Sequence, residues 1–388
     1  MKKKTVDRVM VYAVLIQPVL IIFQHILISV LGMSEDMSTL FRIALTALPM
    51  ALAIVLGIRR NARLFVIPYL VLIALCLISS IFYTGNADYV KREAIEFTLP
   101  VVLSGALCLI CVGDIKLIED CLYRISWCAF GLVLIYLLNM MRGVFFFEKY
   151  DMSMSYAMLL PAMALYSHKK IWALLASFSL IIVILVIGSR GAAVIFFLYV
   201  VYDILFNNPK FVLPFFVLIG VLFASLPFFL GYLSDLGLNS RTLLLLLSGE
   251  GAKISGRDEL YLIIINQLKD HSLFGLGLWG DRQFLDGYYC HNFFLEVCAH
   301  FGMFAGPILL VFFIYLIVRA YFSSDRWHKT VLIKYFCAGL LPLMASNSYL
   351  ISDAFGVFCG ILVVYYQNNH GHRKKVLKLK RYDTPAHM

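Results

Sequence analysis

Long apolar runs recur from one end of this sequence to the other, and they constrain the fold more than any other feature. Runs of roughly 17–25 residues are long enough to cross about 30 Å of hydrocarbon as helices. The chain is 62% hydrophobic and only 14% charged, whereas soluble domains carry about a quarter charged residues. We therefore predict an all-α, polytopic membrane protein in which residues 1–388 form a single integral membrane domain.

The apolar runs predict about twelve transmembrane helices. The first run is too long for the core of a signal peptide and lacks a small-residue cleavage site, so we expect a retained span. The predicted spans are 9–32, 40–57, 64–82, 99–113, 122–141, 154–167, 171–188, 192–206, 211–230, 292–318, 331–347 and 352–367.

The basic residues predict how the chain is oriented. With Met1 in the cytoplasm, alternate loops and the tail at 368–388 also lie inside. These segments hold roughly two thirds of the 33 Lys and Arg, as the positive-inside rule requires. We expect both termini to be cytoplasmic and the basic tail to contact anionic lipid headgroups. The net charge of +10 is thereby explained without a nucleic-acid partner.

The connection at 231–290 is predicted to be a large extracytoplasmic loop between the ninth and tenth spans. Its segment 260–268 supplies an apolar face with polar residues nearby at 266–270, as in a short amphipathic helix. Ser255 and Asp258 have the spacing of a capping box, which places Arg257 at the start of this helix. Gly275 and Gly277 then allow the chain to turn back tightly.

Three outer arginines are candidate ligands for a phosphate group. Arg257 combines a guanidinium with the free N–H groups and positive dipole of a helix N-terminus. Arg190 lies in the short turn between the seventh and eighth spans, and Arg241 is the third candidate. A loop arginine paired with neighbouring acids is the alternative for Arg257. For Arg190, the alternative is a side chain that extends to lipid phosphate.

His291 is the candidate acid–base residue. It lies where the outer loop enters a span, so the dipole of the following helix should disfavour its protonated form. A neutral imidazole is what a general base requires; the alternative is a structural histidine. His291, Glu296 and His300 do not form the H-E-x-x-H motif of a zinc site. We therefore predict no metal and no cofactor.

The order of these features resembles the O-antigen ligase and polymerase superfamily. The resemblance rests on the Ser-Arg-Gly turn after the seventh span, the Gly-Arg pair at 256–257, the Phe-Gly-x-Gly element at 274–277 and the His-Asn-x-x-Leu-Glu sequence at 291–296. It is strongest over residues 180–310, roughly, and the twelve-span layout extends it to the whole chain.

The resemblance implies a metal-independent, inverting glycosyltransferase in a bacterial cytoplasmic membrane. Its donor would be a glycan on undecaprenyl pyrophosphate, and its acceptor a sugar hydroxyl on the outer face. Arg190 and Arg257 would bind the pyrophosphate, with Arg241 and Asn292 as further substrate-binding residues, and His291 would be the catalytic base. Membrane lipid, a flippase and a chain-length regulator are the candidate partners.

Three functions remain open from the sequence. The stretch 346–352 looks more like polymerases of capsule, O-antigen or exopolysaccharide repeat units. Cys290 stands where the ligase pattern often has proline, so we favour the polymerase over a ligase that transfers the glycan to lipid A-core. A transporter of lipid-linked oligosaccharide is the alternative of another class. It should carry its cations within the spans, whereas here they lie in turns and a loop.

Overall fold

The structure, a computed structural model, describes residues 3–141, 152–187, 189–213, 217, 220, 257–271 and 273–382. Every regular element within these ranges is a helix, so the predicted all-α class is confirmed. Helices are expected where lipid surrounds the chain, because a helix satisfies its own backbone hydrogen bonds. Arg241 lies outside the described residues, as do most of the predicted span 211–230 and the first part of the loop 231–290.

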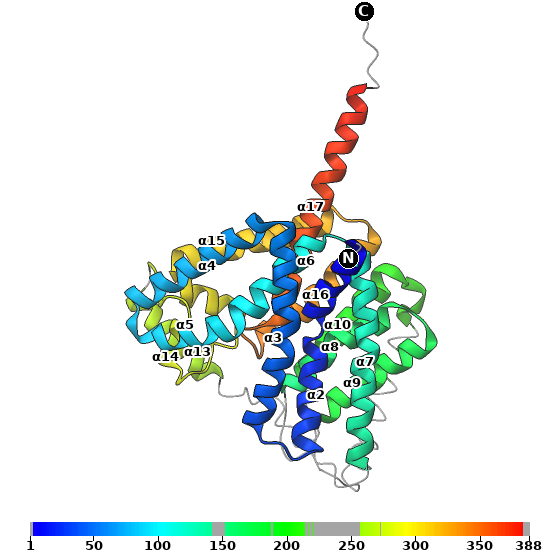
Figure 1. The fold of residues 1–388 in the computed structure, drawn as a ribbon, viewed down its shortest axis with the longest axis horizontal. Helices are drawn as coiled ribbons and strands as arrows, with labels where there is room; N and C mark the ends of the chain where they lie inside the picture. The colour runs from blue at the N-terminus through cyan, green and yellow to red at the C-terminus, as the bar shows by residue number, and fades with distance from the viewer. Residues whose placement is uncertain are drawn as a thin grey trace, which may run out of the picture.

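The N-terminal part of the chain is a bent helix packed against a long straight one. Helices α1 (Lys3–Leu15) and α2 (Gln17–Ser29) occupy the first predicted span, and their axes differ by 46°. Pro18 follows the bend and lacks the N–H of a continuous helix. Helix α3 (Glu35–Arg60) packs against both halves (Figure 1), and α4 (Ala62–Phe82) follows it closely.

The middle of the chain supplies most of the buried core. Its elements are η1 (Thr84–Asn86), α5 (Ala87–Glu93), η2 (Ala94–Leu103), α6 (Ser104–Val112), α7 (Ile115–Met141), α8 (Met152–Ser167), α9 (Ile171–Ile187), α10 (Arg190–Asn207) and η3 (Pro209–Phe211). Element η2 is a π-helix that contains Pro100, and a π-bulge is one way for a helix to continue past a break in its hydrogen bonds. Helix α8 lies at the centre of this part and packs against α2, α7 and α9.

The C-terminal part begins with two short helices and ends with a long one. The elements are α13 (Arg257–Asp270), α14 (Gly280–Phe284), α15 (Phe293–Phe322), α16 (Arg326–Gly339), η5 (Leu341–Met344) and α17 (Asp353–Tyr382). Helix α15 is kinked at Gly302, whose φ is 82°. Figure 1 shows the far end of α17 projecting away from the other helices. The predicted basic tail is therefore helical as far as Tyr382.

The membrane nature of the protein is supported, but the number of spans is not confirmed. Six described helices are long and apolar enough to cross a membrane, and a seventh is counted if α1 and α2 form one span. Their outer faces are apolar: Leu70 of α4 is 60% exposed and Val311 of α15 is 67% exposed. Helices α8 and α9 match predicted spans but have only 16 and 17 residues. The described residues therefore do not confirm the predicted count of twelve spans.

Ion pairs join helix ends near the predicted inner loops. Asp203 of α10 pairs with Lys169 and also accepts hydrogen bonds from Tyr166 Oη at 3.2 Å and Asn207 Nδ2 at 2.8 Å. Lys334 of α16 pairs with Glu119 of α7, and its side chain is 1% exposed. A buried charge needs such a partner. These contacts position the helices at the end of the bundle that we predict to be cytoplasmic.

Candidate active site

Helix α13 is described from Arg257 onward, and Ser255, the predicted capping residue, lies outside the described residues. Arg257 is partly buried and forms no ion pair with any residue that the structure describes. The alternative, an arginine paired with the neighbouring Asp258 or Glu259, is therefore not seen. Ile264 and Leu268 are buried against residues of α15 and the preceding loop, including Ala299 and Leu276. The second half of α13 is thus held against α15 and the segment before it.

The Phe-Gly-x-Gly element joins the outer loop to α15 and to the end of α4. Leu276 N donates to Ala299 O at 2.7 Å, next to the kink of α15. Gly275 has a φ of 69°, and a Cβ there would lie 2.4 Å from Gly302 N. Only glycine tolerates both the positive φ and this close approach. On the other side, Asn86 Nδ2 donates to Leu276 O at 2.7 Å.

A buried ionic cluster follows the Phe-Gly-x-Gly element in the chain. Arg282 of α14 is 0% exposed, and its Nη1 donates to both Asp281 oxygens at 2.7 Å and to Glu296 Oε1 at 2.9 Å. Its Nη2 donates to Ser348 Oγ at 2.8 Å and contacts Glu93 Oε2 at 3.4 Å. The cluster thus joins α5, α14, α15 and the segment between η5 and α17, all of which belong to or border predicted outer loops.

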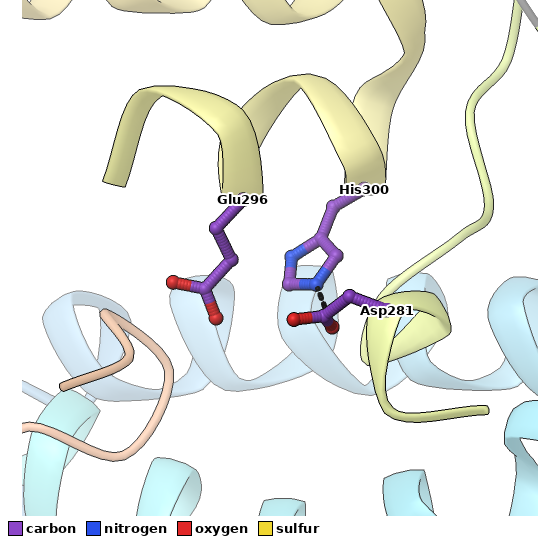
Figure 2. A group of neighbouring side chains, drawn as sticks. All are labelled: Asp281, Glu296 and His300. Atoms are coloured by element: carbon purple, nitrogen blue, oxygen red, sulfur yellow. Dashed lines mark hydrogen bonds and ion pairs between the residues drawn. The ribbon is translucent and has the colours of Figure 1, made fainter. Parts of the chain in front are cut away.

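Asp281, Glu296 and His300 converge within this cluster, as Figure 2 shows. Their ligand atoms lie within 4.8 Å of one another, a spacing that a metal ion could use. His300 Nε2 instead bonds to Asp281 Oδ1 at 2.9 Å, and His300 Nδ1 to Tyr349 Oη at 2.7 Å. Arg282 Nη1 donates to both carboxylates. A metal would have to displace that guanidinium, so the residues fit an ion-pair network better than a metal site.

Charges within the cluster shift the pKa values of its loop members. Burial alone would raise the pKa of Asp281, but Arg282 and His300 lower it well below its ordinary value. Burial would lower the pKa of Arg282, whereas Asp281, Glu296 and Glu93 raise it. Both groups of this loop pair therefore stay charged across the physiological range.

His291 lies at the edge of the cluster, within range of the charge of Arg257. Burial first, and then the positive charges of Arg257 and Arg282, lower the pKa of His291 to about 4. This pKa corresponds to a neutral imidazole near pH 7, and its causes are burial and the two arginines rather than the helix dipole that the sequence suggested. The ring contacts that of Tyr289, with centroids 4.4 Å apart. Its Nδ1 is buried and has no hydrogen-bond partner among the described residues.

A cavity of about 250 Å³ lies on the other side of Tyr289. Its polar lining includes Tyr156, Tyr289, Ser346 and Asn347. Tyr156 also approaches the predicted arginine turn, because a Cβ at Gly191 would lie 2.6 Å from Tyr156 Oη. The cavity is therefore lined by Tyr289, whose ring contacts His291, and by Tyr156, which lies near the start of α10.

The remaining predicted residues differ in their placement. Arg190 is the first residue of α10 and is exposed, with no ion pair to a described residue. Asn292 caps α15: its Oδ1 accepts a hydrogen bond from Leu295 N at 3.2 Å. This cap gives Asn292 a structural role that the sequence prediction did not include. Arg241 cannot be placed, since it lies outside the described residues.

Sequence reasoning missed the centre of the site. Asp281 and Arg282 lie in a polar loop, where charged residues are usually solvated, and their partners Glu93 and Ser348 are far away in the sequence. Glu296 and His300 were considered only as parts of a zinc motif. One available signal was Leu276–Gly280, an apolar stretch directly before Asp281, which indicates that this part of the loop is buried.

The fold and site define a multi-helix membrane protein with cationic side chains and a neutral histidine gathered on one loop. Residues 172–310, about a third of the chain, match the family model described as O-antigen ligase. The predicted resemblance to the O-antigen ligase and polymerase superfamily is confirmed. No curated protein and no solved structure matches the chain. The matched range contains Arg190, Arg257 and His291, as well as the missed pair Asp281–Arg282.

Proposed function

We propose that this protein polymerises glycan repeat units carried on undecaprenyl pyrophosphate, at the outer face of a bacterial cytoplasmic membrane. The family match implies an enzyme like the O-antigen ligases and polymerases, with lipid-linked glycan substrates, and it gives no support to a transporter. The observation that carries the proposal is His291 itself, a partly buried histidine whose Nδ1 has no hydrogen-bond partner among the described residues. Arg257 is close enough for its positive charge to lower the pKa of this histidine.

The proposed reaction is a single displacement at the anomeric carbon of the donor sugar. The acceptor hydroxyl oxygen forms the new C–O bond while the bond to pyrophosphate breaks, and the electron pair leaves with the pyrophosphate on its lipid carrier. His291 takes the hydroxyl proton as the bond forms. Arg257 stabilises the negative charge on the departing pyrophosphate, with Arg190 and Arg241 as further ligands. A single displacement inverts the anomeric configuration.

The arginines would supply the positive charge that a metal supplies in other glycosyltransferases. Guanidinium groups bind pyrophosphate oxygens through two parallel hydrogen bonds. The donor sugar is already activated by its pyrophosphate, so positioning, charge stabilisation and one proton transfer suffice. We therefore propose a metal-independent reaction.

The cavity beside Tyr289 is the proposed site for an acceptor sugar ring. Its volume of about 250 Å³ falls below the roughly 300–1,000 Å³ of drug-sized ligand pockets, so it suits a small group. Hydroxyl and amide groups of Tyr156, Tyr289 and Asn347 offer the hydrogen bonds that sugar hydroxyls need. A sugar bound there would reach the catalytic histidine past Tyr289.

A polymerase is preferred to a ligase because of the segment 346–352. This stretch, whose sequence favours polymerases, contacts the site directly: Ser348 Oγ accepts from Arg282, and Ser346 O accepts from Tyr289 Oη at 3.1 Å. An O-antigen ligase that transfers the finished glycan to lipid A-core remains the second candidate. Both would use the same donor and base.

Purified protein with lipid-linked repeat units, with and without a lipid A-core acceptor, separates the candidates. We expect a ladder of longer lipid-linked glycans without added acceptor. A single transfer that requires lipid A-core would instead identify a ligase, and the absence of any new glycosidic bond would contradict both. His291→Gln is the control variant: it should remain folded and bind the donor, but the reaction should slow by about 10²–10⁴-fold.

A further inference from the structure

The backbone of His291 is held in a conformation that it would not adopt alone. Its φ is 53°, in the left-handed region that non-glycine residues rarely occupy. Such a conformation persists only when neighbouring contacts enforce it. No carboxylate bonds to the imidazole within the described residues, unlike the histidine of a catalytic triad. The position of the imidazole is therefore set by the Tyr289 ring beside it and by the chain on either side of it.

Three contacts hold the residues around His291. Asp281 Oδ2 accepts hydrogen bonds from Cys290 N at 3.1 Å and from Cys290 Sγ at 3.4 Å. Tyr289 Oη donates to Ser346 O at 3.1 Å. On the far side, Asn292 caps α15. The segment that carries the histidine is thus fastened at both of its ends.

Asp281 is in turn held by Arg282 and His300. Two hydrogen bonds from Arg282 Nη1 and one from His300 Nε2 leave the carboxylate little freedom to rotate. Arg282 is attached to Glu296 and Ser348, and its guanidinium lies 5.4 Å from the centre of the Tyr289 ring. The guanidinium therefore touches both supports of the histidine, the Asp281 carboxylate and the Tyr289 ring.

We propose that Asp281 and Arg282 are positioning residues that fix His291 in its reactive conformation through Cys290 and Tyr289. This inference rests on the proposed function, in which His291 is the base. Neither side chain needs to touch the substrate. Their role is to keep the imidazole within reach of the acceptor hydroxyl, because a small displacement of a base from its substrate lowers the rate steeply.

The test is a double-mutant cycle on glycosyl transfer with Asp281→Asn and His291→Gln. Asparagine keeps the size of the side chain but loses the charge and one acceptor oxygen. In the wild-type background we expect kcat to fall by about 10-fold or more while KM for the lipid-linked donor stays within about twofold. In the His291→Gln background the same change should lower the remaining rate less than about twofold, because no base is left to position.

Asp203→Asn is the matched control, since Asp203 is also a buried carboxylate bonded to a cation, but it belongs to the Lys169 pair. Any loss it causes should be the same factor in both backgrounds. Because Asp281→Asn could impair folding, Tyr289→Phe provides a second cycle: it removes the hydroxyl that bonds to Ser346 and keeps the ring beside His291. We expect a smaller loss in kcat with the same dependence on His291.

The outcomes separate the two proposals. Normal polymerisation by folded His291→Gln protein overturns the assigned base and its positioning together. A large His291→Gln loss, combined with Asp281→Asn and Tyr289→Phe effects that are equal in both backgrounds, overturns the positioning role alone. Loss of folded Asp281→Asn protein together with an additive Tyr289→Phe effect also counts against it. The positioning role is supported if either variant lowers the rate more in the wild-type background than in the His291→Gln background.

Discussion

The pH dependence of glycosyl transfer should differ between kcat/KM and kcat. The profile of kcat/KM reports the free enzyme, in which the pKa of His291 is about 4. A base works only when deprotonated, so activity should be constant above this pKa and fall as the pH drops through it. The charged groups that act on the imidazole are Arg257 from α13 and Arg282 and Asp281 from α14. Only Asp281 raises its pKa.

Binding of the lipid-linked donor should raise the pKa of His291 and so move the acid limb of the pH profile to higher pH. Pyrophosphate beside Arg257 adds negative charge, which opposes the effect of the arginine and favours the imidazolium. Two unit charges about 8 Å apart interact by about 2 kcal/mol at an effective dielectric constant of about 20, or about 1.5 pKa units. The acid limb of kcat should therefore lie about 1.5 units above that of kcat/KM. In the enzyme–donor complex, the pKa of His291 then lies closer to the working pH, which favours general-base catalysis.

Initial rates with lipid-linked donor at saturating and limiting concentrations give both profiles. Arg257→Gln should raise the acid limb of kcat/KM, because it removes a positive charge that lowers the pKa of His291. Lys269→Gln is the matched control: Lys269 is exposed at the other end of α13 and bonds only to Asn266 among the described residues. An acid limb of kcat/KM near 6.5, the ordinary pKa of histidine, would refute the argument. The argument would also be refuted if Arg257→Gln did not change the position of this acid limb.

Three further predictions follow from the site and its topology. Arg257→Lys keeps the charge but loses the paired hydrogen bonds of the guanidinium, so kcat should fall by about 10²-fold, whereas full activity would mean that the residue is only a surface cation. Gly275→Ala should destabilise the fold by about 1–3 kcal/mol, because a Cβ would lie 2.4 Å from Gly302 N. Thermal unfolding in detergent measures this loss, and an unchanged unfolding temperature would contradict the described packing of the loop against α15. Cysteines introduced at positions 190 and 257 should react with a membrane-impermeant thiol reagent in intact cells, whereas one at position 60 should not, and the reverse pattern would overturn the orientation.

The parts of the structure that the sequence predicts are those determined by local chemistry. Hydrophobic runs indicate helices because lipid leaves no other way to satisfy the backbone. The apolar pattern of 260–268 predicts a helix there, and α13 spans it. The count of spans was less predictable, because a run such as 154–167 can be a short helix buried among others. Helix α8 is nearly fully buried, so its apolar residues face protein rather than lipid.

The buried cluster could not be predicted, because its members depend on long-range contacts. Nothing near Arg282 in the sequence indicates that Glu93 and Ser348 will bond to it. Glycines at 275 and 302 bring the loop against α15, and that approach buries the pair. The signal therefore lay in the combination of close-packing glycines and an apolar stretch, rather than in the charged residues themselves.

This arrangement also explains how a histidine beside a carboxylate-rich cluster stays neutral. Three carboxylates, those of Asp281, Glu296 and Glu93, surround Arg282, and an unpaired acid near His291 would stabilise its imidazolium. Arg282 and His300 engage both oxygens of Asp281 instead. Of the charges that act on His291, Asp281 accordingly has the smallest effect, after burial, Arg257 and Arg282. The cluster can thus hold the base in place without protonating it, and the charge that tunes the base is left to Arg257 and to the substrate that it binds.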